Sequence, residues 1–176
     1  MKKVLFFGFV TILTGCADSH NLNISTTELT NKIPLTSSVY VALSEDGRYG
    51  EKKYRGSGVL VSNIIKSGLI VHMNDIIVAH KAESFKDSIG IAAHNGSDYL
   101  LYPTIMHWED RATEWSGKAD KVKVKIVTWK IKNNVEVSSA IIDGSSGLAT
   151  FGGDHPQDLL PKPINSYIDT LFEIER

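Results

Sequence analysis

Apolar positions between residues 39 and 96 alternate between the two-residue period of a strand and the 3.6-residue period of a helix. A β-rich run at 39–43 precedes a helical pattern over 57–69, and a second apolar run at 76–79 precedes a helical pattern over 83–94 that ends at Asn95-Gly96. Ser57 is expected to cap the first helix, and Gly68 lies on its buried stripe, where another element can approach closely. This order of strand, helix, strand, helix predicts parallel pairing through crossover helices.

The pattern changes after residue 99 to three successive strands and one helix. The long apolar run 99–108 predicts a central strand, and 121–131 and 135–142 predict two more, with a bulge expected after Ile126 where the alternation changes phase. A stripe from Ile164 to Phe172 predicts a closing helix. We therefore expect an α/β (α+β) sandwich whose mixed sheet has a parallel first half and an antiparallel meander, in the order strand-helix-strand-helix-strand-strand-strand-helix.

The first sixteen residues predict a membrane address. Two lysines precede an apolar run from Val4 to Leu13, which is about half the length of a membrane span and therefore typical of a signal peptide. The run ends in Leu13-Thr14-Gly15-Cys16, which resembles the bacterial lipobox, so we expect cleavage between Gly15 and Cys16 and lipidation of the Cys16 thiol. Ala17 after the cysteine favours the outer membrane. The alternatives are an ordinary secretory signal or a buried core strand.

The remaining chain divides into a linker and one domain. Residues 17–37 are rich in Ser, Thr and Asn, and their few apolar residues follow no period. We expect residues 1–15 to be a lipoprotein signal peptide, 16–37 the lipidated cysteine with a flexible tether, and 38–176 a single periplasmic α/β domain.

Composition excludes several classes of function. The 176 residues are 42% hydrophobic and carry a net charge of -1, so no basic field attracts nucleic acid. The single cysteine excludes an internal disulfide framework and a Cys-rich zinc site. The six histidines lack metal-binding spacing; His107 and Glu109 share one strand face and could both touch a metal, but we expect no metal and no cofactor.

Two segments carry candidate functional residues. In 107–117, two tryptophans flank carboxylates and an arginine, which predicts either a recognition surface formed by Trp108, Glu109, Asp110, Arg111, Glu114 and Trp115, or a hairpin corner with packed indoles and a locally paired Arg111. The second segment follows Gly152-Gly153. Asp154 and His155 belong to the same candidate recognition surface and could form an acid–base pair, whereas in the other interpretation Asp154 or Pro156 begins the last helix.

Several segments resemble an uncharacterised bacterial lipoprotein family catalogued as domain of unknown function 4823. They are the lipobox, Val39 to Leu43, Asp46 to Gly50, the specific His107 to Gly117 segment, and Asp158 to Pro161. The family implies no activity, so the resemblance supports the cellular address and the fold only.

The function expected from these observations is that of an outer-membrane-anchored periplasmic lipoprotein. It would act as a non-enzymatic binding or accessory module for an envelope protein or for peptidoglycan. One alternative is a cell-envelope hydrolase acting on glycan or peptide. Another is a subunit of an oligomeric envelope assembly.

Overall fold

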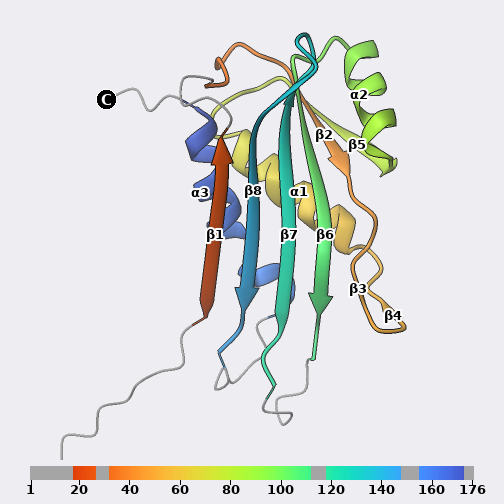
Figure 1. Ribbon diagram of the computed structural model, residues 1–176, viewed down its shortest axis with the longest axis vertical. Coiled ribbons are helices and arrows are strands. Elements are labelled where there is room, and N and C mark those ends of the chain that lie inside the picture. The colour runs from red at the N-terminus through yellow and green to blue at the C-terminus, as the bar shows by residue number, and fades with distance from the viewer. Residues whose placement is uncertain (1–17, 27–31, 112–117, 148–154, 173–176) are drawn as a thin grey trace, which may run out of the picture.

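A six-stranded mixed sheet forms the centre of the molecule (Figure 1). The computed structural model describes residues 18–26, 32–111, 118–147 and 155–172. The strands lie in the order β1-β8-β7-β6-β2-β5, with a separate two-stranded hairpin β3-β4. The elements are β1 (Ser19–Thr26), β2 (Val39–Leu43), β3 (Arg48–Tyr49), β4 (Lys52–Lys53), α1 (Ser57–Leu69), β5 (Ile76–Ala82), α2 (Phe85–His94), β6 (Tyr99–Glu109), β7 (Lys121–Lys130), β8 (Val135–Ser145), the short 3-10 helix η1 (Pro156–Leu159) and α3 (Pro161–Leu171).

The predicted fold class is confirmed. β2 pairs in parallel with β5 on one side and with β6 on the other, and α1 and α2 make the two connections. β6, β7 and β8 then form an antiparallel meander. Pro103 lies in β6 beyond Leu101, the last residue that pairs with β2, so its missing N–H falls where the strand has lost one neighbour.

Helices cover the two faces of the sheet unequally (Figure 1). α1 and α3 pack on one face and bury the main core, which includes Val41, Ile65, Ile126 and Ile168. α2 lies on the other face, where a smaller cluster gathers around Tyr40, Ala92 and Leu100. No helix in the described part of the chain covers the rest of that face, over β1, β8, β7 and the second half of β6.

The two helices of the main core approach each other at Gly68, as the sequence predicts. A Cβ atom at this position would lie 2.6 Å from Cδ1 of Ile168 and 2.7 Å from Oδ1 of Asn165. The absence of a side chain therefore allows α1 and α3 to touch.

The prediction that Ser57 caps α1 is wrong. Its hydroxyl donates to the Tyr54 carbonyl at 2.7 Å and accepts the Gly47 N–H at 2.8 Å. The cap is supplied from a distance, because Oδ1 of Asp46 accepts the N–H groups of Gly56 (3.0 Å) and Gly58 (3.1 Å).

The predicted flexible tether at 16–37 is also wrong where the structure describes it. Residues 19–26 form β1, which pairs with β8 in eight antiparallel residue pairs. Ile33 is buried, and its N–H donates to the Leu171 carbonyl. The sequence did not indicate β1 because its residues are mostly polar and exposed. An edge strand of this kind forms its backbone hydrogen bonds without the alternating apolar pattern by which strands are predicted.

The bulge predicted after Ile126 lies elsewhere. Alternation in β7 continues through Thr128, which is fully buried because its hydroxyl shares a 2.7 Å hydrogen bond with the Tyr167 hydroxyl. The extra residues are Val137 in β8 and Met106 in β6, where the register with β7 shifts. Because Thr128 is polar but buried, the hydrophobic pattern of β7 wrongly indicated a change of phase after Ile126.

Candidate functional site

Four strands begin or end in one row at one end of the sheet. Glu109 pairs with Lys121, Lys121 with Ser145, and Ser145 with Ser19. We call this row and the residues that contact it the lower end of the sheet, as it is oriented in Figure 1. The described candidate residues of both segments lie here.

Glu109 is the most buried charged residue of the lower end, with 3% of its surface exposed. It forms an ion pair with Arg111, and its Oε2 lies 3.2 Å from Nε2 of His107. The guanidinium of Arg111 also donates to the Tyr49 hydroxyl at 3.1 Å. Burial acts to raise the pKa of Glu109, but hydrogen bonds from His107, Arg111 and Tyr49 together with the Arg111 charge outweigh it and lower the pKa.

Asp110 and His155 come together from the two segments that the sequence singled out. Nδ1 of His155 lies 3.6 Å from Oδ1 of Asp110. The backbone of Asp110 is fixed by the Tyr54 hydroxyl, which accepts its N–H at 3.2 Å. His155 immediately precedes η1, and its N–H donates to the Asp158 carboxylate at 3.0 Å. Pro156 thus begins the short helix η1, and the last helix, α3, begins at Pro161.

Asp120 is a buried carboxylate that the sequence analysis missed. Its Oδ1 accepts the Arg111 N–H, and its own N–H donates to the Ser146 hydroxyl at 2.8 Å. Burial raises the pKa of Asp120, and the negative charge of Asp110 adds to this effect. An isolated aspartate before a strand gives no sequence signal of such burial.

Of the remaining candidate residues, Trp108 is buried, contrary to the recognition-surface hypothesis, and the others lie outside the described residues. Trp108 is 2% exposed and belongs to the main core, on the sheet face that α1 and α3 cover. Trp108 therefore offers no stacking surface to a ligand. Together with the local pairing of Arg111, this burial agrees with the hairpin-corner interpretation. The other candidates, Gly15, Cys16, Glu114, Trp115 and Asp154, lie outside the described residues.

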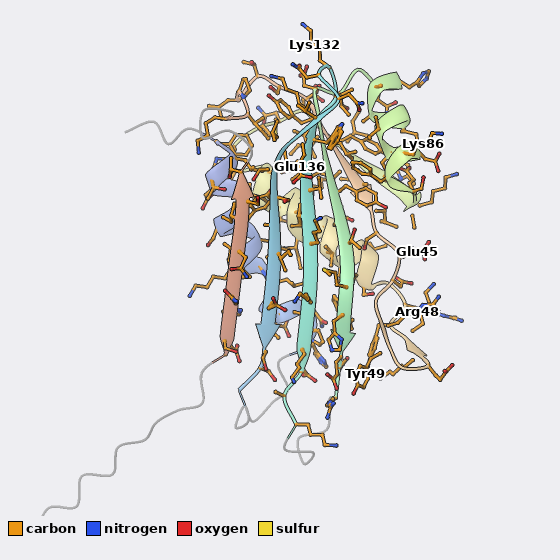
Figure 2. The ribbon with its side chains drawn as sticks, viewed as in Figure 1. Glu45, Arg48, Tyr49, Lys86, Lys132 and Glu136 are labelled. Atoms are coloured by element: carbon orange, nitrogen blue, oxygen red, sulfur yellow. The ribbon has the colours of Figure 1, made fainter. Side chains whose placement is uncertain are left out.

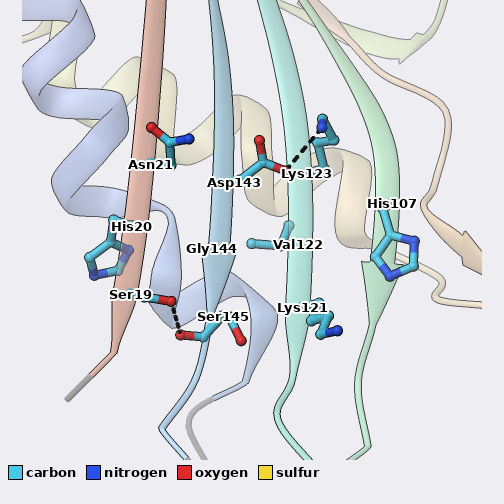
Figure 3. A pocket seen from close by; sticks show the side chains of 10 residues that line it. All are labelled: Ser19, His20, Asn21, His107, Lys121, Val122, Lys123, Asp143, Gly144 and Ser145. Carbon is cyan, nitrogen blue, oxygen red and sulfur yellow. Dashed lines mark hydrogen bonds and ion pairs between the residues drawn. The ribbon is translucent and has the colours of Figure 1, made fainter. Parts of the chain in front are cut away.

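The sheet face opposite α1 and α3 presents a polar surface above the lower end. We call this the open face; its outward side chains are Asn21, Asn23 and Ser25 of β1, Ser139, Ile141 and Asp143 of β8, Lys121, Lys123 and Lys125 of β7, and His107 of β6. Lys123 pairs with Asp143 at 3.1 Å. A depression of about 410 Å³ lies here, with His107 at one side and His20 at the other (Figure 3).

The chemistry available in this arrangement is charge pairing and hydrogen bonding. Across residues 18–26, 32–111, 118–147 and 155–172, no three His, Cys, Asp or Glu side chains are placed to hold a metal ion. Glu109 is ionised and engaged by Arg111, so it is a poor proton donor at neutral pH. In the same ranges, no helix has the length and apolar character needed to cross a membrane.

The sequence of residues 31–171 matches one family model over most of the chain. The chain belongs to the DUF4823 family. That family is described as a domain of unknown function, which confirms the predicted family. β1 precedes the matched residues, so the edge strand lies outside the DUF4823 match. Among curated proteins, none matches the DUF4823 chain in sequence.

Two solved structures of PelC share the fold of this DUF4823 protein. A PelC dodecamer from Paraburkholderia phytofirmans has a TM-score of 0.67 and 14% identity, and the match covers 89% of this chain and 100% of PelC. The dodecamer of a leucine-to-methionine variant of PelC from the same organism, in another crystal form, gives a TM-score of 0.66 at 14% identity, covering 87% of this chain and 98% of the variant. Protein XCC0632 from Xanthomonas campestris, of family DUF330, has a TM-score of 0.48 and 11% identity, covering 78% and 83%.

Proposed function

We propose that this protein is an outer-membrane lipoprotein whose periplasmic domain is a non-enzymatic binding or accessory module for another envelope component. The lipobox that ends at Cys16 supports the anchor, because two or three acyl chains hold a protein on a membrane where one does not. The carboxylates of Glu109, Asp110 and Asp120 support a non-enzymatic role, because each is buried or held in an ion pair.

The observation that carries this proposal is the open face. A mixed sheet that is covered by helices on one face and only partly on the other leaves strand residues available to a partner. Three lysines at alternate positions of β7 stand beside residues of β8, which separates them from the asparagines of β1. Lys123 alone among these lysines has an ion pair in the described residues. Lys121 and Lys125 therefore favour a partner that presents carboxylates, either an acidic protein surface or the peptide stems of peptidoglycan.

A second candidate is a subunit of an oligomeric envelope assembly. The similarity to PelC favours it, because PelC shares the fold across nearly its whole length and is described as a dodecamer. The partner on the open face would then be another copy of this chain.

Site-specific photo-crosslinking in living cells tests both candidates. A crosslinker at Asn23 or Lys125 samples the open face, and one at Lys162, exposed on α3, is the matched control on the opposite side. A discrete adduct with an envelope protein or with peptidoglycan from the open face supports the accessory module, and an adduct of twice the subunit mass supports the assembly. Equal adducts from Lys162, or none from the open face, contradict both.

The anchor is tested separately. Cys16→Ser removes the thiol that attacks the lipid donor, so the variant is expected to lose acylation and to leave the outer-membrane fraction. Mass spectrometry of the N-terminal peptide checks this, and normal acylation of the serine variant would contradict the lipoprotein proposal.

A further inference from the structure

The segment 48–55, which we call the basic hairpin, concentrates positive charge. It contains β3 and β4 and carries Arg48, Lys52, Lys53 and Arg55 against the single acidic residue Glu51, a formal charge of +3 in eight residues. The whole chain has a net charge of -1, so this excess is local. All four basic residues are exposed.

Most of this charge is not neutralised by neighbouring side chains. Lys53 lies 3.8 Å from Asp46, whose carboxylate already caps α1, and Lys52 lies over the Tyr54 ring. Arg48 and Arg55 have no ion pair within the part of the chain that the structure describes. Glu45 stands farther from the lower end than Arg48 and Tyr49 do (Figure 2).

The basic hairpin is fixed against the lower end of the sheet by two tyrosines. Tyr49 accepts a hydrogen bond from Arg111 at 3.1 Å. Tyr54 contacts the backbone of Asp110, so both arms of the hairpin are held at the end of β6. The hairpin therefore has a defined orientation relative to the strands.

The chain segment that would bear the lipid leaves the domain at the same end. Oδ1 of Asp18 accepts the Gly147 N–H at 3.0 Å, which places Asp18 beside the end of β8. Only Ala17 separates Asp18 from Cys16, and two Cα–Cα steps of about 3.8 Å allow the Cys16 Cα at most about 8 Å from that of Asp18. Acyl chains on Cys16 would thus hold the β1 corner of the lower end within roughly one Debye length of the lipid headgroups.

We propose that the lower end of the sheet faces the membrane and that the basic hairpin binds the headgroups of anionic phospholipids. This inference rests on the proposed lipidation of Cys16. Clustered Lys and Arg side chains at a lipid surface are attracted to anionic headgroups, and Arg pairs with phosphate through two N–H groups. The strands then stand away from the membrane, and the open face remains accessible from the periplasm.

Fluorescence quenching on the acylated full-length protein tests the orientation. The protein is reconstituted in vesicles of phosphatidylethanolamine and phosphatidylglycerol that contain a headgroup-labelled quencher lipid. A fluorophore is placed by Glu51→Cys in the basic hairpin or by Lys132→Cys at the opposite end of the sheet (Figure 2). We expect at least threefold stronger quenching at position 51 than at 132, and equal quenching would overturn the inference.

Charge reversal tests the headgroup contact. Arg48→Glu with Arg55→Glu is expected to lower quenching at position 51 below that of the parent protein, as is replacement of the anionic lipid by phosphatidylcholine. The acyl anchor is retained in both experiments and should keep quenching at 51 above that at 132. Lys86→Glu with Lys162→Glu is the control: it changes the net charge of the protein by the same amount as the hairpin reversal, but on α2 and α3, and should leave quenching at position 51 unchanged. Quenching at position 51 that stays at the parent level after reversal of the hairpin charges would overturn the headgroup contact. Failure of acylation at Cys16 would instead contradict the proposed function, and mass spectrometry detects it independently.

Discussion

Glu109 and Arg111, two residues apart at the end of β6, form an ion pair whose carboxylate is 3% exposed while the guanidinium side chain keeps 29% of its surface exposed. The pair closes a corner of the sheet, because Arg111 also contacts Tyr49 through its side chain and Asp120 through its backbone. Stability of this corner should therefore depend on the charge of two buried carboxylates whose pKa values shift in opposite directions.

Glu109→Gln is expected to destabilise the domain by about 2–3 kcal/mol at pH 7, because it leaves Arg111 without its buried partner. The pKa of Glu109 is lowered in the folded protein, so its contribution is present above the pKa of an unfolded glutamate and is lost as the pH falls through the folded pKa. Urea unfolding at pH 7 and at pH 3 measures this. If the free energy of unfolding of Glu109→Gln differs from that of the parent protein by the same amount at both pH values, the predicted pH dependence is contradicted.

Asp120→Asn should change the stability of the domain at pH 7 in the opposite direction from Glu109→Gln. The pKa of Asp120 is raised in the folded protein, so the aspartate stabilises the fold below its unfolded pKa and loses that contribution as the pH rises through the folded pKa. The amide keeps an acceptor for the Arg111 N–H, so we expect a small gain, below about 1 kcal/mol at pH 7, that disappears in acid. A clear loss of stability at pH 7 would show that the charge is needed.

Gly68→Ala should destabilise the domain by about 1–3 kcal/mol, because the added methyl group meets Ile168 and Asn165 of α3. Gly90→Ala on the exposed side of α2 is the control: nothing lies within 4 Å of its Cβ position, and alanine should stabilise the helix by about 0.4–1 kcal/mol. Thermal unfolding of both variants compares them. Equal effects would mean that α1 and α3 do not touch at Gly68.

Tyr167→Phe is expected to cost about 1–3 kcal/mol, because the fully buried Thr128 hydroxyl loses its 2.7 Å hydrogen bond. Adding Thr128→Val should recover part of this loss by removing the unsatisfied group. A double-mutant cycle measured by denaturant unfolding gives the coupling between the two hydroxyls, and additive losses would contradict the predicted coupling.

Strong periodicity explains why most of the fold was predictable from sequence. The runs at 39–43 and 99–108 and the helical stripes that include Gly68 and Ile168 are local patterns imposed by burial on one face or two. β1 and the hairpin β3-β4 were not predicted, because their side chains are mostly polar and exposed. β1 also pairs with a strand distant in sequence, and β3 and β4 are only two residues long each.

The candidate site was less predictable than the fold, because the sequence shows which residue types are present but not which way their side chains point. The 107–117 segment was correctly singled out, but only the register shift at Met106 decides that Trp108 enters the core while Glu109 turns towards Tyr49. Asp120 and the contact of Asp110 with His155 depend on three loops meeting at one end, which no spacing in the sequence encodes.

The pairing of β1 with β8 gives the domain a mechanical property. Hydrogen bonds between antiparallel strands lie perpendicular to the strand axis, and a pull on residue 18 away from the sheet acts along β1. Such a force loads all eight residue pairs together in shear rather than opening them one after another. A domain held by its N-terminus would therefore transmit tension from its attachment point into the centre of the sheet before the first strand peels away.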